Sequence, residues 1–289
     1  MTTTAQPRLH RPPRADLPIY LALAFGGIWL AMSPLLLSGF QRTGNRPAMG
    51  TFETVCIFAA MLTPALAAVF VLRYVVKVPD LRAALGLVLP RPWRKGLADC
   101  ALAIAVPLGL TVASLVVAWL AGGYEFDLSR LFELQMLGWV GAAAFQVVIG
   151  LPFFYGEELG WQGYLLPRMR RYGLLPAYVR TGVIMALWHL PTLLMGGQYP
   201  GHSMLASVGS FVVACLLVLP IFSWLRLRSG SVLPAVLAHA VVSNVSTRLV
   251  WQLSAPGQDL DPMTVGLQGW PGWLVMGVLV SWLAWTKRL

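Results

Sequence analysis

Charged and thiol-bearing side chains are scarce in this chain of 289 residues. Asp, Glu, Lys and Arg together make up 11% of it, and there are 3 cysteines and 4 histidines. Cys56, Cys100 and Cys215 are odd in number and form no CxxC pair, which argues against a disulfide framework and a thiolate metal site. The chain also lacks an HExxH sequence, a serine-nucleophile motif and a Cys–His arrangement, so covalent catalysis and the common zincin geometry have no support.

Apolar surface, by contrast, is in excess. Hydrophobic residues make up 57% of the chain and the mean hydropathy is +0.70, more than a soluble domain of this length could bury. Apolar runs of about 20 residues predict an all-α polytopic membrane protein, a helix bundle with about eight spans. Residues 1–16 are expected to form a disordered basic tail, and residues 17–289 a single transmembrane domain, most simply in the plasma membrane. The predicted spans are 17–39, 51–75, 97–121, 132–157, 174–195, 204–225, 231–251 and 267–286.

Lys and Arg alternate between the predicted connections in the way that sets membrane orientation. With the N-terminus inside, only Arg42, Arg46, Arg130 and Arg248 of the 21 Lys and Arg residues fall outside, and the other 17 fall on the cytoplasmic side. An odd number of spans would destroy this partition, so we expect both termini to be cytoplasmic. The net charge of +10 then reflects topology rather than nucleic-acid binding.

Two adjacent carboxylates, Glu157 and Glu158, lie near the cytoplasmic end of the fourth predicted span. Ionisable residues inside a membrane are costly, so two in succession need partners and indicate a functional site. His189 and His239 lie inside two further spans. At 1.5 Å per residue they are roughly 22 and 12 Å from the cytoplasmic ends of their helices, and His189 is about 13 Å deep if its helix begins at Arg180. We therefore expect a shared cavity that is open to the cytoplasm.

These side chains suit the hydrolysis of a peptide bond, because a desolvated carboxylate can deprotonate water and a histidine can orient it or donate to the leaving amine. Either histidine alone is more often explained by a hydrogen bond between helices, and the carboxylate pair alone by a charged helix end. Their combination favours a site. Glu157, His189 and His239 also match the ligand types of a His₂Glu zinc site, but their spacing does not show convergence. The cofactor is left open between a divalent metal such as zinc and none.

The segments that carry these residues resemble the motifs of a known family. They are Gly156–Pro167, Ala186–Pro191 and Leu233–His239. In order and spacing they are similar to the motifs of the CPBP intramembrane proteases, which include type II CAAX prenyl endopeptidases and bacteriocin-processing or self-immunity proteins. The first resembles EExxxR, the second FxxxH, and the third a His that is followed four residues later by Asn or Asp. The likeness covers roughly residues 130–250. It implies a protease in which Glu157 activates water and the histidines and an Asn or Asp assist, with a metal among them in an older interpretation.

The sequence departs from the family pattern in the first and last motifs. Gln162 replaces the motif Arg, which at i+4 would pair with Glu158, so glutamine keeps hydrogen-bond donors but loses the charge. Ser243, rather than Asn, stands four residues after His239, and Asn244 is one residue further. On a regular helix Ser243 faces the site, whereas a π-bulge would bring Asn244 round instead.

We predict an intramembrane endopeptidase that hydrolyses a peptide bond near the cytoplasmic membrane surface. Its partners would be the lipid bilayer and a peptide or protein substrate, lipidated or not, and no nucleic acid. The predicted site consists of Glu157 as base, Glu158 as supporting carboxylate, His189 and His239 orienting water or the transition state, Ser243 or Asn244 binding the oxyanion, and Gln162 in support. Two alternatives use the same residues: a transporter or proton relay, and a catalytically silent immunity or scaffold protein.

Overall fold

The computed structural model describes residues 15–42 and 50–289. About 77% of the protein is helical, and the described residues contain no strand beyond an isolated bridge between Phe126 and Ser254, so the all-α prediction is confirmed. Most of the predicted N-terminal tail, residues 1–14, lies outside the described residues, as does Arg46.

The longer helices are α1 (Asp16–Leu37), α2 (Thr51–Phe70), α4 (Trp93–Leu120), α5 (Leu134–Glu158), α7 (Leu174–Trp188), α9 (Met204–Ser229), α10 (Leu233–Val241) and α12 (Trp270–Trp285). Shorter α-helices are α3 (Leu81–Leu85), α6 (Leu166–Met169), α8 (Leu190–Leu194) and α11 (Thr247–Gln252). Three segments are π-helical, namely η1 (Val71–Val76), η3 (Leu159–Leu165) and η5 (Val242–Ser246), and η2 (Leu128–Phe132) and η4 (Arg170–Tyr172) are 3-10 helices.

Six helical stretches in the described part of the chain are long and apolar enough to cross a membrane. They are α1, α2 with η1, α4, α5 through η4, α9, and α10 through α11. The helices α7 and α12 are apolar too, but they have 15 and 16 residues. At 1.5 Å per residue they measure roughly 22 to 24 Å, against a hydrocarbon core of about 30 Å. Each of the eight predicted spans therefore contains a helix, and the number that cross the membrane stays a prediction.

The pattern of burial within α1 shows why these helices suit lipid. A narrow stripe at nearly every fourth residue is buried, including Tyr20, Ala24, Ile28 and Met32. The remaining surface of the helix is apolar as well, with Leu30 75% exposed. A helix that is apolar all round and buried along one stripe satisfies both a protein neighbour and acyl chains.

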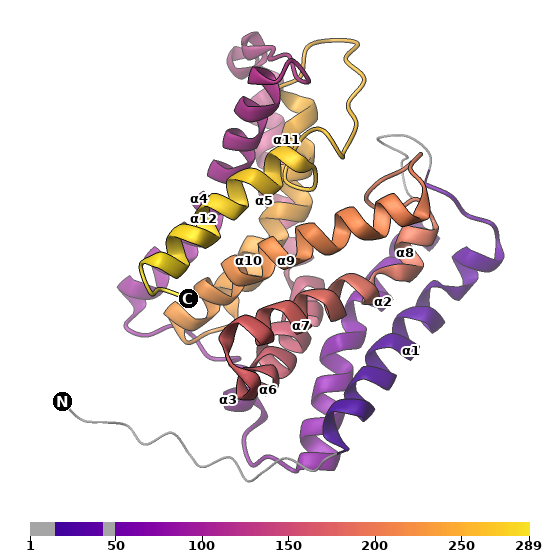
Figure 1. Cartoon of the computed structure of the whole chain (residues 1–289), viewed down its shortest axis with the longest axis vertical. Helices are drawn as coiled ribbons and strands as arrows, with labels where there is room; N and C mark the ends of the chain where they lie inside the picture. The colour runs from indigo at the N-terminus through magenta and orange to yellow at the C-terminus, as the bar shows by residue number, and fades with distance from the viewer. Residues whose placement is uncertain (1–14, 43–49) are drawn as a thin grey trace.

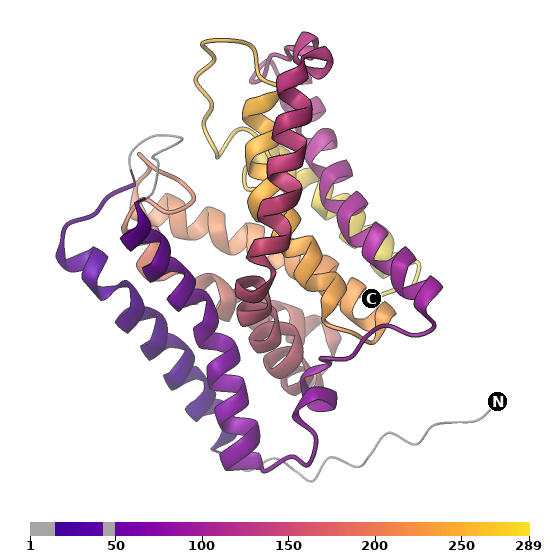
Figure 2. The ribbon, with the colours of Figure 1, turned by 180° about the vertical axis from the view of Figure 1, so that it is seen from behind.

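The helices form two groups that meet at α9 and α10. In Figure 1, α1 lies along α2 on one side of the molecule, and α4 and α12 lie on the other. Helix α10 contacts α4, α5 and α9, so it lies in the middle of the bundle. Figure 2 shows α5 (crimson) descending from the top of the molecule into this centre.

Candidate active site

Glu157 and Glu158 are the last two residues of α5 and are almost completely buried. Immediately after them the chain enters the π-helix η3 without a break, so the pair lies within one continuous helical stretch of 39 residues that ends at Tyr172. Their depth in the molecule comes from this continuation, because α5 does not end at a surface. Two carboxylates in such a place require polar partners.

Glu158 has a histidine partner on α10. His239 Nδ1 lies 2.8 Å from Glu158 Oε1, and the geometry is that of a hydrogen bond from the ring N–H to the carboxylate. Because Nδ1 is engaged in this bond, Nε2 is the His239 ring atom left to meet a ligand. The prediction that the carboxylate pair needs histidine partners is thus met for Glu158 by direct contact.

His189 lies at the junction of α7 and α8. Pro191, which cannot donate a backbone N–H to an α-helix, stands at the start of α8, and α7 ends at Trp188. His189 Nδ1 lies 2.8 Å from the Met185 carbonyl oxygen and donates to it, because a carbonyl can only accept. The other ring atom, Nε2, lies 4.0 Å from Glu157 Oε2.

A cavity of about 840 Å³ joins these groups. Glu157, His189 and His239 all line it, although they come from three different helical segments. Glu158 does not line it, and Glu157 Oε2 has no hydrogen-bond partner among the described residues. The two adjacent carboxylates therefore differ in their surroundings: Glu157 faces the cavity, and Glu158 lies behind it and holds His239.

The last motif begins on α10, but the two residues proposed to follow His239 in the site, Ser243 and Asn244, lie on a π-helix. Residues Val242–Ser246 form η5, in which hydrogen bonds run from i to i+5 and each turn takes up more residues than in an α-helix, so the side chains after His239 are turned relative to those of a regular helix. The regular helix that favoured Ser243 is absent, and the π-bulge that favours Asn244 is present. Both residues line the cavity, Ser243 being exposed and Asn244 half-buried. A Cβ built on Gly150 would lie 3.3 Å from Asn244 Nδ2, which places the amide against α5 two turns before Glu157.

Ser246 was missed in the sequence analysis. It lines the same cavity, is 2% exposed, and its hydroxyl has no hydrogen-bond partner in the described structure. The spacing of seven residues from His239 is no reliable signal for it, because the π-helix η5 lies between the two residues.

Gln162, which was expected in a supporting role, has its side-chain hydrogen bond on α9 and not at Glu158. It is 1% exposed, and its Oε1 accepts a hydrogen bond of 3.0 Å from Ser223 Oγ on α9. Its Nε2 has no partner in the described residues, and it does not line the cavity. The i+4 argument assumed a regular α-helix, whereas Gln162 lies within the π-helix η3. Its contact ties η3 to α9 and gives no direct support to the carboxylate.

The described side chains include no group of three or more His, Cys, Asp or Glu residues arranged to hold a metal ion. Glu157, His189 and His239, the predicted ligands, line one cavity without converging in this way. The residues therefore do not fit a metal in this arrangement.

A helical bundle with carboxylates and histidines buried around an internal cavity defines an integral membrane protein with a candidate hydrolytic site. Residues 134–245 match the model of a protein family described as type II CAAX prenyl endopeptidase Rce1-like. The match runs from the start of α5 into η5 and includes every predicted site residue. This match confirms the resemblance to CPBP proteases over that part of the chain and supports peptidase character at the level of the family. The comparison with curated proteins gave no match.

Proposed function

We propose that the protein is an intramembrane endopeptidase that uses water activated by Glu157. The observation that carries the proposal is the convergence of Glu157, His189 and His239 on one cavity from three helical segments. The match of residues 134–245 to a protease family supports the reaction class.

The position of the nucleophilic water follows from the hydrogen-bonding capacity of two side chains. His189 donates from Nδ1 to Met185, so a neutral His189 carries its lone pair on Nε2. Glu157 Oε2 lies 4.0 Å away, which is too far for a direct hydrogen bond but suits a water molecule that donates one hydrogen to each atom. Such a water is held and polarised by two acceptors.

The reaction then needs two proton transfers through Glu157, one from the water to the carboxylate and one from the carboxyl group to the leaving amine. Glu157 takes a proton from the water as the oxygen attacks the scissile carbonyl carbon, and the carbonyl oxygen becomes an oxyanion. The amide of Asn244 and Nε2 of His239, when it carries a proton, are the donors for that oxyanion. When the carbon–nitrogen bond breaks, the leaving amine takes the proton from Glu157, and a carboxylic acid and an amine form; the acid proton then passes to the amine, so that a carboxylate and an ammonium group are released.

Glu158 acts through His239 in this scheme. Its hydrogen bond to Nδ1 fixes the orientation of the ring, so that Nε2 points to the reacting atoms. Removing this carboxylate would free the ring to rotate.

Peptide cleavage by the purified protein tests the proposal. The protein in detergent would be incubated with a library of prenylated and unprenylated peptides, and the products read by mass spectrometry. We expect cleavage by the wild type and none by Glu157→Gln. Absence of cleavage across both peptide classes would favour the silent relative, and proton flux in liposomes that depends on Glu157 would favour the proton relay.

A further inference from the structure

The site cavity is lined by connections from one end of the bundle only. Apart from the helices and from His189 at the junction of α7 and α8, its lining residues lie after α1, between α8 and α9, and between α11 and α12. They include Arg42, Gln198, Pro200, Pro262 and Gln268. The asymmetry of Lys and Arg assigns all three connections to the non-cytoplasmic side. The connections rich in Lys and Arg, near α3, around α6 and between α9 and α10, contribute no lining residue.

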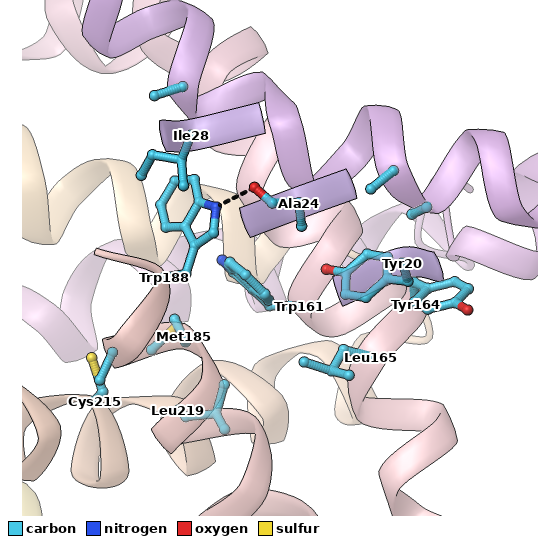
Figure 3. Close-up of a cluster of buried hydrophobic side chains, with 14 of the residues drawn as sticks. Tyr20, Ala24, Ile28, Trp161, Tyr164, Leu165, Met185, Trp188, Cys215 and Leu219 are labelled. Atoms are coloured by element: carbon cyan, nitrogen blue, oxygen red, sulfur yellow. Dashed lines mark hydrogen bonds between the residues drawn. The ribbon is translucent and has the colours of Figure 1, made fainter. Parts of the chain in front are cut away.

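The opposite end is filled by aromatic side chains. Trp161 and Tyr164 follow Glu157 on η3 and are completely buried. Tyr20 from α1 stacks on Tyr164 with ring centroids 4.3 Å apart and meets Trp161 edge-on at 6.4 Å. Trp188 packs edge-on against Trp161 at 5.5 Å and donates from Nε1 to the carbonyl oxygen of Ala24. Figure 3 shows this layer between α1, η3 and α7.

Ion pairs between helices tie the same end together. Arg168 Nε on α6 lies 2.6 Å from Asp16 Oδ2 at the start of α1, and Asp16 is 3% exposed. On the other group of helices, Asp99 of α4 is fully buried and pairs with Lys95 and with Arg228 of α9, each at 2.7 Å. Asp16 and Asp99 are buried, so separating either of them from its basic partners would leave a buried carboxylate alone.

We propose that the site is entered from the non-cytoplasmic side, so that its substrate is a peptide segment that reaches the membrane from that side. The identity of the substrate rests on the proposed function, whereas the side of entry rests on the cavity and the closed end. From the sequence, the cavity was expected to open to the cytoplasm, and the connections rich in Lys and Arg were expected to lie on the cytoplasmic side. The cavity is lined from the end opposite to those connections, so the two expectations cannot both hold. We keep the orientation given by the distribution of Lys and Arg.

The side of entry is tested by labelling single cysteines with a membrane-impermeant maleimide. In a background with Cys56, Cys100 and Cys215 replaced by alanine, Thr247→Cys places a thiol in the cavity lining, and Arg170→Cys places one at the opposite end. Both positions are exposed, and neither belongs to the catalytic machinery. Intact cells are labelled first, and permeabilised cells second.

We expect Thr247→Cys to be labelled in intact cells. We expect Arg170→Cys to remain unlabelled in intact cells and to be labelled after permeabilisation. Labelling of Thr247→Cys only after permeabilisation, at neither stage, or together with Arg170→Cys in intact cells would overturn the proposal. If either variant fails to elute as a single species in detergent, Gln252→Cys, also in the lining, or Arg171→Cys replaces it. Labelling does not depend on peptide cleavage. The proposed side of entry and the proposed peptidase activity can therefore be rejected independently, the first by the labelling pattern and the second by the cleavage assay with wild type and Glu157→Gln.

Discussion

His239 Nδ1 lies 2.8 Å from Glu158 Oε1, and this contact joins α10 to the end of α5. The neighbouring Glu157 instead faces the cavity, with His189 Nε2 at 4.0 Å. Adjacent residues on a helix point about 100° apart, so one carboxylate can hold a histidine while the other meets substrate. The roles of the two carboxylates can therefore be separated by mutation.

Glu157→Gln should abolish peptide cleavage. The change keeps the shape and most of the hydrogen bonding but removes the proton acceptor, so we expect a loss of at least about 10²-fold in kcat, the usual contribution of a general base. Turnover is measured on a cleaved peptide, and thermal unfolding in detergent serves as the control, which should stay near the wild-type value. Retained turnover with normal unfolding would reject Glu157 as the base.

Glu158→Gln should cost less than Glu157→Gln, because a glutamine oxygen can still accept the hydrogen bond from His239 Nδ1. Glu158→Leu has no acceptor and should lose both turnover and stability, since the buried ring N–H then lacks a partner. The comparison of kcat for the two variants isolates the hydrogen bond from the charge. Equal losses in both would show that the charge, rather than the orientation of His239, is what matters.

Composition and motif spacing predict a helical membrane protein and the resemblance to a protease family, and they single out the carboxylates and histidines that the fold brings close together. Hydropathy located a helix in every predicted span, because the thickness of the hydrocarbon core sets the length of the apolar run that a spanning helix needs. The irregular turns could not be predicted. The π-helices η3 and η5 change the direction in which Gln162 and Asn244 point relative to a regular α-helix, and no local residue pattern specifies these π-helices.

The side from which the cavity is lined was equally beyond the sequence. The depths of Glu157, His189 and His239 were estimated from helix ends that the charges suggested. In the folded structure, the aromatic layer around Tyr20 and Trp161 fills the end of the bundle that carries the connections rich in Lys and Arg, and this is the end that was expected to be open. Such a layer is formed by residues far apart in the chain, and their contacts become visible only in the folded structure.

Asn244→Ala should reduce turnover more than Ser243→Ala. The π-helix brings Asn244 toward the face of His239, and its amide lies near Gly150 on α5, whereas Ser243 is exposed. Loss of one oxyanion donor costs on the order of 10²-fold in kcat, and we expect this for Asn244→Ala. Asn244→Asp is the matched control, since it keeps the size and removes the donors. The reverse order of the two alanine variants would assign the oxyanion role to Ser243.

Ser223→Ala should destabilise the protein, because Gln162 Oε1 loses its donor inside the bundle. An unsatisfied buried acceptor costs about 1 to 3 kcal/mol, whereas removal of both partners can be nearly neutral. We therefore expect the double variant Ser223→Ala with Gln162→Leu to unfold closer to the wild type than Ser223→Ala alone. The midpoint of denaturant unfolding in detergent measures this. Additive destabilisation in the double variant would mean that the hydrogen bond contributes no coupling.

Asp16→Asn should destabilise the closed end of the bundle. Asp16 is 3% exposed, accepts from Arg168 Nε at 2.6 Å, and its loss of charge leaves a largely buried guanidinium without its counter-ion. Breaking one partner of a buried pair costs roughly 3 kcal/mol or more. The matched control is Asp127→Asn, because the Asp127–Arg130 pair has side chains 23% and 33% exposed and such surface pairs contribute about 1 kcal/mol or less. Denaturant unfolding of both variants in detergent gives the comparison. If Asp16→Asn were no more destabilising than Asp127→Asn, the ion pair would not hold α1 to α6, and closure of this end would depend on the aromatic layer alone.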